Sequence, residues 1–333
     1  MRHRPFGRSG LQVSELVFGG GWVGGLLIHQ DDETKLRALR RALDAGINWI
    51  DTAPSYGDGR SEEALGWLLR EVDRKPYLST KVRLDLGKLD DISGQVEASL
   101  ESSLERLRRD SVDLLQLHNP VASQTGERAI GIDRVLGKGG VADALEHMRE
   151  QGLTKLIGIT ALGEGAACKQ AIASGRFDSA QVYYNLLNPS AGQAMPAAWS
   201  GQDFSRLLDA CRKEGVATMI IRVLAAGVLA SEQRHGRENQ ITEDADLETE
   251  AARARVVFQA LGDRYGTRAQ TAIRFALANP DVTCVLVGMA EPSHLEEALA
   301  AAETGPPPQD ALDRLTPLYA RDFDRPSRDF DRP

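Results

Sequence analysis

Four polar residues of this chain have types that together could exchange a proton with a bound substrate. They are Asp51 and Tyr56 in WIDTAPSYG, Lys81 in YLSTKV and His118 in DLLQLHNP. Asp51, Lys81 and His118 stand at or just past the C-terminal end of a short apolar run, where a strand is expected to end. Because such ends converge on one face of a parallel barrel, we expect these residues to share a pocket.

The chemistry that fits these four residues is proton transfer to a carbonyl oxygen that receives a hydride. Tyrosine alone is a weak acid, with an ordinary pKa of about 10. A nearby ammonium such as Lys81 lowers that pKa, and a carboxylate such as Asp51 keeps the ammonium charged and in place. His118 would donate a hydrogen bond to the carbonyl oxygen or share the proton transfer with Tyr56. Taken singly, residues of these types are usually surface groups or helix caps.

The joint pattern, above all DTAPSYG followed by SEEALG, resembles the aldo-keto reductases, NAD(P)-dependent oxidoreductases built on a (β/α)8 barrel. The resemblance covers residues 4–302. It implies that Tyr56 is the general acid in reduction and the general base in oxidation, with the hydride supplied by nicotinamide.

The resemblance also implies that NADP(H) or NAD(H) lies extended across the barrel mouth and contacts residues at several strand ends. The implied cofactor-binding residues are Gly21, Trp22, Asp51, Thr160, Gln181, Arg222, Val223, Leu224, Gly227, Gly288, Met289, His294, Glu297 and Ala298. Thr160 and Gln181 would hold the carboxamide of nicotinamide, whereas the segment from Gly288 would meet the adenosine end. The helix expected to begin near Pro292 offers free amide groups to an anion.

Four positions depart from the common pattern of the family. Ala161 replaces an amide side chain, Ile221 replaces an aromatic, and Arg222 stands where many relatives have serine. Arg222 could form a salt bridge at the barrel rim or contact the cofactor pyrophosphate or an acidic substrate group. His294 stands where NADP-preferring relatives place arginine, and the GIT and VLVGM strings resemble the galactose dehydrogenase-like branch. We therefore expect dual cofactor use or a lean toward NAD.

The substrate is expected to be a small carbonyl compound or a sugar. Candidate substrate-binding residues are Trp22, Tyr56, His118 and Asn119, with Trp199 as a further candidate. No metal site is expected, because the three cysteines, Cys168, Cys211 and Cys284, are widely spaced, and we interpret them as reduced, buried thiols.

Alternating strand and helix signals predict the elements that position these residues. Strands are expected at 16–19, 47–51, 77–81, 112–118, 155–159, 180–184, 216–221 and 284–287. Helices are expected at 32–45, 61–72, 92–108, 139–151, 163–174, 202–214, 247–278 and 292–302, with Ser61 and Ser93 as caps. The pattern predicts an α/β fold, a (β/α)8 TIM barrel preceded by an N-terminal β-hairpin. A doubly wound sheet is the alternative, disfavoured because GGGWVGG lacks the G-x-G-x-x-G spacing.

We expect a single domain over 1–333, with a core at about 15–302 and a C-terminal extension at 303–333. Three long connections, 119–138, 185–201 and 230–246, follow strands and are expected to shape substrate choice. The repeat RDFDRP, at 321–326 and 328–333, suggests a tail outside the core, with a docking or lid role as the alternative.

Composition limits the classes of partner. With 40 basic and 48 acidic residues, the net charge of −8 argues against nucleic-acid binding. No apolar stretch has the length of a membrane span or of a signal-peptide core, so we expect a cytoplasmic protein that is a monomer or a weak homo-oligomer. Two other functions stay open. One is a barrel isomerase or lyase that uses Lys81 and His118, and the other is a nucleotide-binding redox sensor or scaffold with slow turnover.

Overall fold

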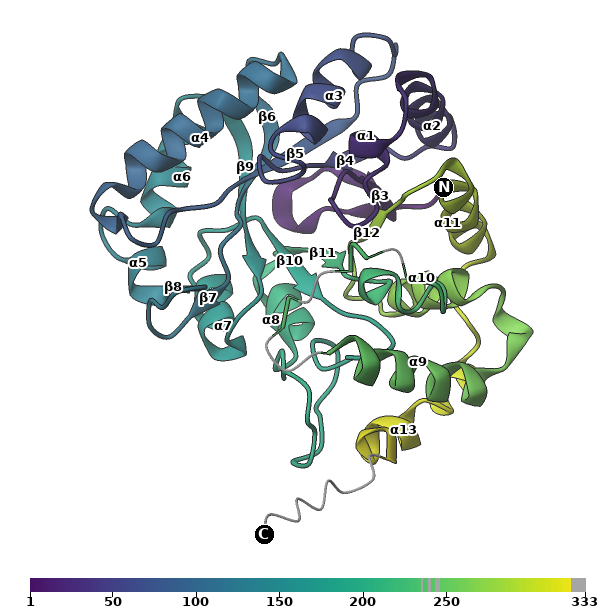
Figure 1. Ribbon diagram of the computed structural model, residues 1–333. Helices are drawn as coiled ribbons and strands as arrows, with labels where there is room; N and C mark the ends of the chain where they lie inside the picture. The colour runs from purple at the N-terminus through teal and green to yellow at the C-terminus, as the bar shows by residue number, and fades with distance from the viewer. Residues whose placement is uncertain (235, 239–240, 243–245, 325–333) are drawn as a thin grey trace.

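Eight parallel strands close a barrel at the centre of the molecule (Figure 1). The computed structural model describes residues 1–234, 236–238, 241–242 and 246–324. The barrel strands are β3 (Leu16–Gly19), β4 (Trp49–Asp51), β5 (Tyr77–Val82), β6 (Val112–Leu117), β9 (Thr154–Ala161), β10 (Ser179–Tyr183), β11 (Ala217–Ile221) and β12 (Cys284–Gly288). Each strand pairs with the next in this order, and β12 pairs with β3. The predicted (β/α)8 barrel is confirmed, and the doubly wound alternative is wrong.

Helices surround the barrel as an outer ring (Figure 1). Those that connect successive strands are α2 (Asp32–Asp44), α3 (Arg60–Leu68), α4 (Ile92–Leu107), α6 (Val141–Glu150), α7 (Gly165–Ala173), α8 (Leu207–Glu214) and α10 (Arg268–Ala278), and α11 (Pro292–Thr304) follows the last strand. Further helices are α1 (Leu26–His29), α5 (Ile132–Leu136), α9 (Leu247–Leu261), α12 (Gln309–Asp313) and α13 (Thr316–Ala320). Short 3-10 turns are η1 (Gly7–Ser9), η2 (Leu89–Asp91), η3 (Ala225–Gly227), η4 (Asp263–Tyr265) and η5 (Asp322–Asp324).

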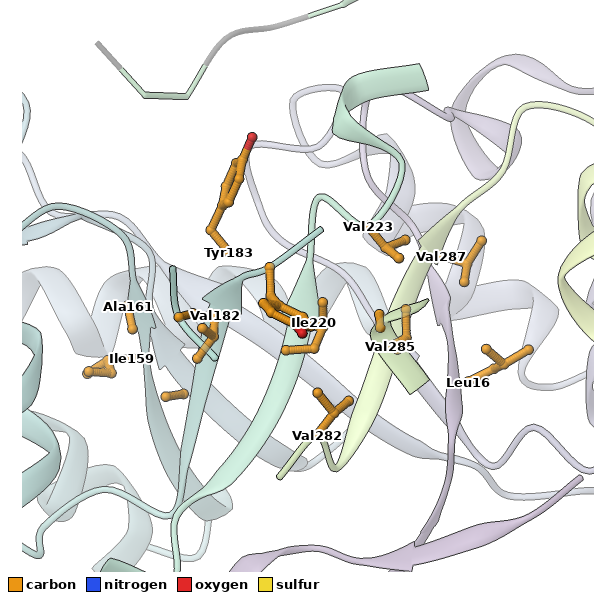
Figure 2. Packing of buried hydrophobic residues seen from close by; sticks show 14 of the residues in the cluster. Leu16, Ile159, Ala161, Val182, Tyr183, Ile220, Val223, Val282, Val285 and Val287 are labelled. Carbon is orange, nitrogen blue, oxygen red and sulfur yellow. The ribbon is translucent and has the colours of Figure 1, made fainter. Parts of the chain in front are cut away.

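Alternating side chains of the strands divide the apolar core into two layers. Outward-facing residues such as Val182, Ile220 and Val285 pack against the helices, and Figure 2 shows them side by side on adjoining strands. The inner layer fills the barrel and consists of Phe6, Val13, Val17, Trp49, Leu114, Ala217, Met219, Cys284 and Leu286. All three cysteines are free and buried, as expected.

The predicted N-terminal hairpin forms outside the barrel sheet. Strands β1 (His3–Pro5) and β2 (Gln12–Ser14) pair antiparallel. Phe6, between them, stacks on Trp49 with ring centroids 4.7 Å apart. Because both rings are fully buried, the hairpin closes the N-terminal end of the barrel.

Two predicted helix caps are wrong. Helix α3 begins after Gly59, whose φ of +89° is a left-handed conformation that glycine adopts readily, and Ser61 lies buried inside the first turn. Helix α4 is capped by Asp91, whose side chain accepts a hydrogen bond from the Gly94 amide, instead of by Ser93.

The expected 247–278 helical region is two helices. α9 ends at Leu261 with Gly262 as its C-cap, and α10 begins after the capping box formed by Thr267 and Gln270. The 119–138 connection is partly regular: it contains the small parallel pair β7 (Val121–Ala122) and β8 (Ile130–Gly131) in addition to α5.

The first part of the C-terminal extension packs onto the barrel, which corrects the prediction of a tail outside the core. Tyr319 and Phe323 are buried, and the Tyr319 hydroxyl donates a hydrogen bond to the Leu186 carbonyl at 3.1 Å. Asp322 forms an ion pair with Arg253 of α9 at 3.0 Å. The prediction of a tail rested on the charged repeat, which gives no information about the apolar residues on one side of α12 and α13. The second copy of RDFDRP, 328–333, and part of the 230–246 connection lie outside the described residues.

Across the part of the chain that the structure describes, we find no helix with the length and apolarity needed to cross a bilayer.

Candidate active site

A buried ion pair forms the base of the site. Asp51 is the last residue of β4, and Lys81 lies near the end of the neighbouring strand β5. The Lys81 Nζ lies 2.6 Å from Asp51 Oδ2 and donates a second hydrogen bond to the Thr52 carbonyl at 2.8 Å. Burial alone would lower the pKa of Lys81, but Asp51 and Tyr56 outweigh it and raise that pKa. Lys81 is therefore charged near neutral pH.

The second carboxylate oxygen of Asp51 is fixed by two donors. Ser79 Oγ and Gln181 Nε2 each donate to Asp51 Oδ1 at 2.8 Å. Gln181 Nε2 also donates to Gln116 Oε1 at 3.0 Å. These bonds cross the barrel interior from β5, β6 and β10, so the carboxylate cannot rotate away from Lys81.

Tyr56 lies above this pair, on the loop between β4 and α3. Lys81 Nζ is 4.7 Å from the centroid of the Tyr56 ring. Burial raises the pKa of Tyr56, Lys81 lowers it and Asp51 raises it, with a net pKa above the ordinary value. The direction expected for the Lys81 contribution is present, but the expected net lowering is absent because desolvation of the phenolate is the larger effect.

His118 directly follows β6 and faces Tyr56 edge-on, with ring centroids 5.8 Å apart and planes at 84°. Burial, together with the charges of Lys81 and Arg83, lowers the pKa of His118 to about 3. The ring is therefore neutral near physiological pH and can donate one hydrogen bond. Its buried Nδ1 has no hydrogen-bond partner among the described residues.

The loop after β3 covers one side of Tyr56. A side chain at Gly21 would begin 3.9 Å from the Tyr56 Cζ, so glycine leaves the approach to the ring open. Trp22 is 40% exposed and contacts His29 edge-on at 5.1 Å, which fits a pocket wall. Gly24 is pressed against the Met289 backbone, and Leu26 N donates to the Met289 carbonyl at 2.9 Å. This loop therefore joins the catalytic side of the mouth to the end of β12.

Thr160 and Ala161 end strand β9, next to β6. Thr160 is buried, and its Oγ1 has no hydrogen-bond partner among the described residues. Since a buried hydroxyl without a partner costs free energy, this atom is available for a ligand. Gln181, the register partner of Thr160 on the neighbouring strand β10, is bonded through its amide nitrogen to Asp51 and Gln116.

The segment after β11 enters the mouth in an unusual backbone conformation. Arg222 has a φ of +59°, and Gly227 has a φ of +101°. Burial lowers the pKa of Arg222, while Tyr183, Tyr56 and Glu250 act in the opposite direction. Val223 is buried and Leu224 is half-buried. Arg222, which was expected at the barrel rim, therefore lies close enough to Tyr56 to lower the pKa of the Tyr56 hydroxyl.

The residues expected at the adenosine end lie around the start of α11. Gly288 is exposed, while Met289 and Ala298 are buried. His294 Nδ1 accepts a hydrogen bond from the Ala290 amide at 3.2 Å. Glu297 accepts one from the Thr267 hydroxyl.

Two substrate-site candidates have structural partners. The side-chain amide of Asn119 accepts from Leu84 N at 2.7 Å and donates to Leu84 O at 3.1 Å, so it fixes the loop after β5. Trp199 packs beside Phe323, with Arg253 over its ring at 5.3 Å.

A family model described as "Aldo/keto reductase family" matches residues 15–320. The chain belongs to the aldo/keto reductase family. It is accordingly an oxidoreductase enzyme.

Several named proteins are similar to almost the whole chain. The L-galactose dehydrogenase of Arabidopsis thaliana is 28% identical, covering 90% of this chain and 87% of that protein. The D-threo-aldose 1-dehydrogenase of a Pseudomonas species is 30% identical, covering 87% and 89% respectively. The holo form of an aldo-keto reductase from Bacillus halodurans superposes with a TM-score of 0.73 at 22% identity and covers 96% of each chain, which supports the fold.

The family implies a nicotinamide cofactor, and two unpartnered atoms of this aldo/keto reductase fit one. Thr160 Oγ1 and His118 Nδ1 are both buried, and they end the adjoining strands β9 and β6. A polar group bound at these strand ends would supply partners to buried atoms that have none among the described residues. Within the described ranges, no group of three His, Cys, Asp or Glu side chains is arranged to hold a metal ion.

Ser79 and Thr52 bond directly to the ion pair and Gln116 supports it through Gln181, and none of the three was among the predicted site residues. A usable signal exists for two of them. Ser79 lies two residues before Lys81, and Gln116 two before His118, so period-2 alternation places each pair on one face. The contact of Thr52 is through its carbonyl, which no side-chain pattern reveals.

Proposed function

We propose that this enzyme interconverts a carbonyl group and an alcohol, or a lactol and a lactone, by NAD(P)(H)-dependent hydride transfer. The observation that carries the proposal is the joint placement of Tyr56, Lys81 and Asp51, with the ammonium 4.7 Å from the Tyr56 ring and 2.6 Å from the carboxylate. Nicotinamide, when bound, supplies or accepts the hydride.

In this proposal the chain's own residues handle the proton and orient the substrate. The Tyr56 hydroxyl donates its proton to the carbonyl oxygen in reduction and takes it back in oxidation. Lys81 stabilises the phenolate that remains, and Asp51 keeps Lys81 in place. Neutral His118 donates a hydrogen bond to the same oxygen, so the developing charge meets two donors.

The raised pKa of Tyr56 gives the two directions opposite pH dependence. Reduction needs the protonated hydroxyl, so its rate should fall as pH rises through that pKa. Oxidation needs the phenolate, so its rate should increase over the same range. The pH profiles of reduction and oxidation should therefore give the same apparent pKa, that of Tyr56.

Cofactor binding is proposed for Thr160 at the nicotinamide end, for Arg222 to Gly227 along the phosphates, and for Gly288, Met289 and the first turns of α11 at the adenosine end. His294 uses Nδ1 to accept the Ala290 amide, and it replaces the arginine of NADP-preferring relatives. This supports dual use or a lean toward NAD. A preference of more than about a hundredfold for NADPH in side-by-side kinetics, about 2.7 kcal/mol, would overturn the lean.

We propose an aldose as the substrate class, because the relatives named above are a galactose dehydrogenase and an aldose dehydrogenase. Trp22, which follows Gly21 in the loop beside the Tyr56 ring, is an exposed aromatic on which the apolar face of a sugar ring can pack. A panel of aldoses and simple aldehydes, assayed in both directions with both cofactors, tests this choice.

The substitution Tyr56→Phe tests the reaction type. It removes only the hydroxyl, so we expect kcat to fall by about 10²- to 10⁴-fold while the Kd for NADH and the melting temperature stay near wild type. Cofactor affinity is measured by quenching of tryptophan fluorescence. Near wild-type turnover in the folded variant would refute the assignment, and cofactor binding without turnover on the whole panel would favour a sensor or scaffold.

A further inference from the structure

The position of Tyr56 depends on a loop whose two ends are held by residues outside the four catalytic candidates. Tyr56 lies on a loop, and residues 57–59 that follow it are all left-handed, with φ of +66° at Gly57, +53° at Asp58 and +89° at Gly59. A run of this kind has no hydrogen-bond ladder of its own, so its shape depends on what holds its two ends. The first end is the barrel strand β4, and the second is the first turn of α3.

The first turn of α3 is bound to three barrel strands at once. Ser61 N donates to the Tyr56 carbonyl at 3.2 Å, which joins the helix directly to the tyrosine backbone. Ser61 Oγ donates to the Gly20 carbonyl, after β3, at 3.0 Å, and accepts from Thr52 Oγ1, after β4, at 2.8 Å. Glu62 supplies the contact with the third strand.

Glu62 is a fully buried carboxylate with no role in the reaction. Its Oε1 accepts from Thr80 Oγ1 at 2.5 Å, and its Oε2 lies 2.7 Å from both Nε and Nη2 of Arg106 on α4. Thr80 is the residue between Ser79 and Lys81 on β5. Because strand side chains alternate, Ser79 and Lys81 point inward to Asp51 while Thr80 points outward to Glu62.

Arg106 also packs against the first turn of α3. A Cβ at Gly59 would lie 2.7 Å from Arg106 Cδ, so the arginine stem already fills the space beside this glycine. Gly66, one turn beyond Glu62, has no room for a side chain because it would overlap the Arg106 carbonyl oxygen. The pair therefore fixes both the start of α3 and the left-handed run that precedes it.

We propose that Glu62 is a positioning residue for Tyr56: through Thr80 and Arg106 it fixes the start of α3 against the outer wall of β5, directly behind Lys81. Strand β5 then sets the distance between the Tyr56 hydroxyl and the Lys81 ammonium, because its inner face carries Lys81 and its outer face holds Glu62 through Thr80. This inference rests on the proposed function, in which Tyr56 is the general acid.

The test is the variant Glu62→Gln, which keeps the volume of the side chain and removes its charge. Because small misplacements of a reacting group are costly, we expect kcat to fall by about 10- to 100-fold, while the KM for the carbonyl substrate and the Kd for NADH stay near wild type. The alkaline limb of carbonyl reduction should move to higher pH, because Tyr56 loses part of the pKa lowering that Lys81 provides.

Glu146→Gln is the matched control. Glu146 on α6 accepts two hydrogen bonds from Arg176, in the loop before β10 and so at the opposite end of the strands from the site. The variant Glu146→Gln should leave kcat and the pH of the alkaline limb unchanged. If Glu62→Gln behaves like Glu146→Gln at a temperature where both are folded, the inference is wrong.

Two further measurements keep the test decisive. If Glu62→Gln fails to fold, Thr80→Val, which removes one hydroxyl and keeps the Glu62–Arg106 pair, should lower kcat and move the alkaline limb in the same direction; no change in either overturns the inference. Wild type and Tyr56→Phe are assayed first. Equal activity of those two proteins would refute the proposed function itself, whereas an inactive Tyr56→Phe with an unaffected Glu62→Gln refutes only the positioning role.

Discussion

The side chain of Lys81 is fully buried, so its charge has to be compensated within the protein. Asp51 provides that compensation, and Ser79 and Gln181 fix the carboxylate in turn. The cost of desolvating an ion pair at this depth is the physical reason to expect that the pair is kept for its effect on Tyr56 and not for stability.

Asp51→Asn should therefore damage folding as well as turnover. It leaves the Lys81 ammonium buried without a counter-charge, and we expect the free energy of unfolding to fall by about 3–5 kcal/mol. The double variant Asp51→Asn with Lys81→Met should recover much of that loss while remaining inactive. Urea unfolding of the three proteins measures both effects, and a double variant no more stable than the single one would contradict this account.

His118 makes stability depend on pH. Its pKa is about 3 in the fold and about 6.5 when unfolded, so below pH 6.5 the unfolded chain binds a proton that the folded chain does not. This contribution is complete above pH 6.5 and decreases as pH falls toward 3. His118→Asn should remove it, giving a smaller difference in unfolding free energy between pH 7.5 and pH 5 than wild type. Equal differences in the two proteins would show that His118 is protonated in the fold.

Asp51, Lys81 and His118 could be predicted to lie together from residue type and from their positions at the ends of apolar runs, because strand ends are local features of the sequence. Tyr56 follows no apolar run, and it was predicted from the DTAPSYG motif. Their partners were harder to predict. Ser61 was predicted to cap the helix, and Glu62 was given no role although both stand in the SEEALG motif. Their roles depend on which strands the helix crosses, and that is decided by tertiary packing.

At the scale of elements, the barrel strands were predicted within one or two residues, since parallel strands buried on both faces are nearly continuous apolar runs. The C-terminal extension was predicted poorly. Its attachment depends on Tyr319 and Phe323, two aromatics within a charged, proline-bearing stretch whose composition indicates solvent exposure. The Phe323 ring lies under Arg253 of α9 and beside Trp199 of the 185–201 connection, and neither contact is local in sequence.

Phe323→Ala and Phe6→Ala should separate attachment of the extension from stability of the barrel. Phe6 stacks inside the barrel end, so its loss should lower the free energy of unfolding by about 3–5 kcal/mol. Phe323 lies near the edge of the packed core, beside Tyr319 and Arg253, so its loss should release the extension locally. We expect faster proteolysis near residues 309–324 with a much smaller change in melting temperature. A loss in Phe323→Ala as large as that in Phe6→Ala would mean that the extension and the barrel unfold as one unit.

For the molecule as a whole, the N-terminal hairpin has an effect on the order of folding. Arg2 bonds to the Ala302 carbonyl at 3.0 Å, and Arg4 bonds to those of Val282 at 2.6 Å and Leu277 at 2.9 Å. During synthesis these arginines emerge some 300 residues before their partners, and closing so long a loop is slow. The barrel end beneath Trp49 therefore stays unsealed until α11 has left the ribosome. Stalled chains that stop before residue 277 should bind a hydrophobic dye such as ANS, and chains long enough for α11 to have left the ribosome should not; equal binding by both would refute this order of folding.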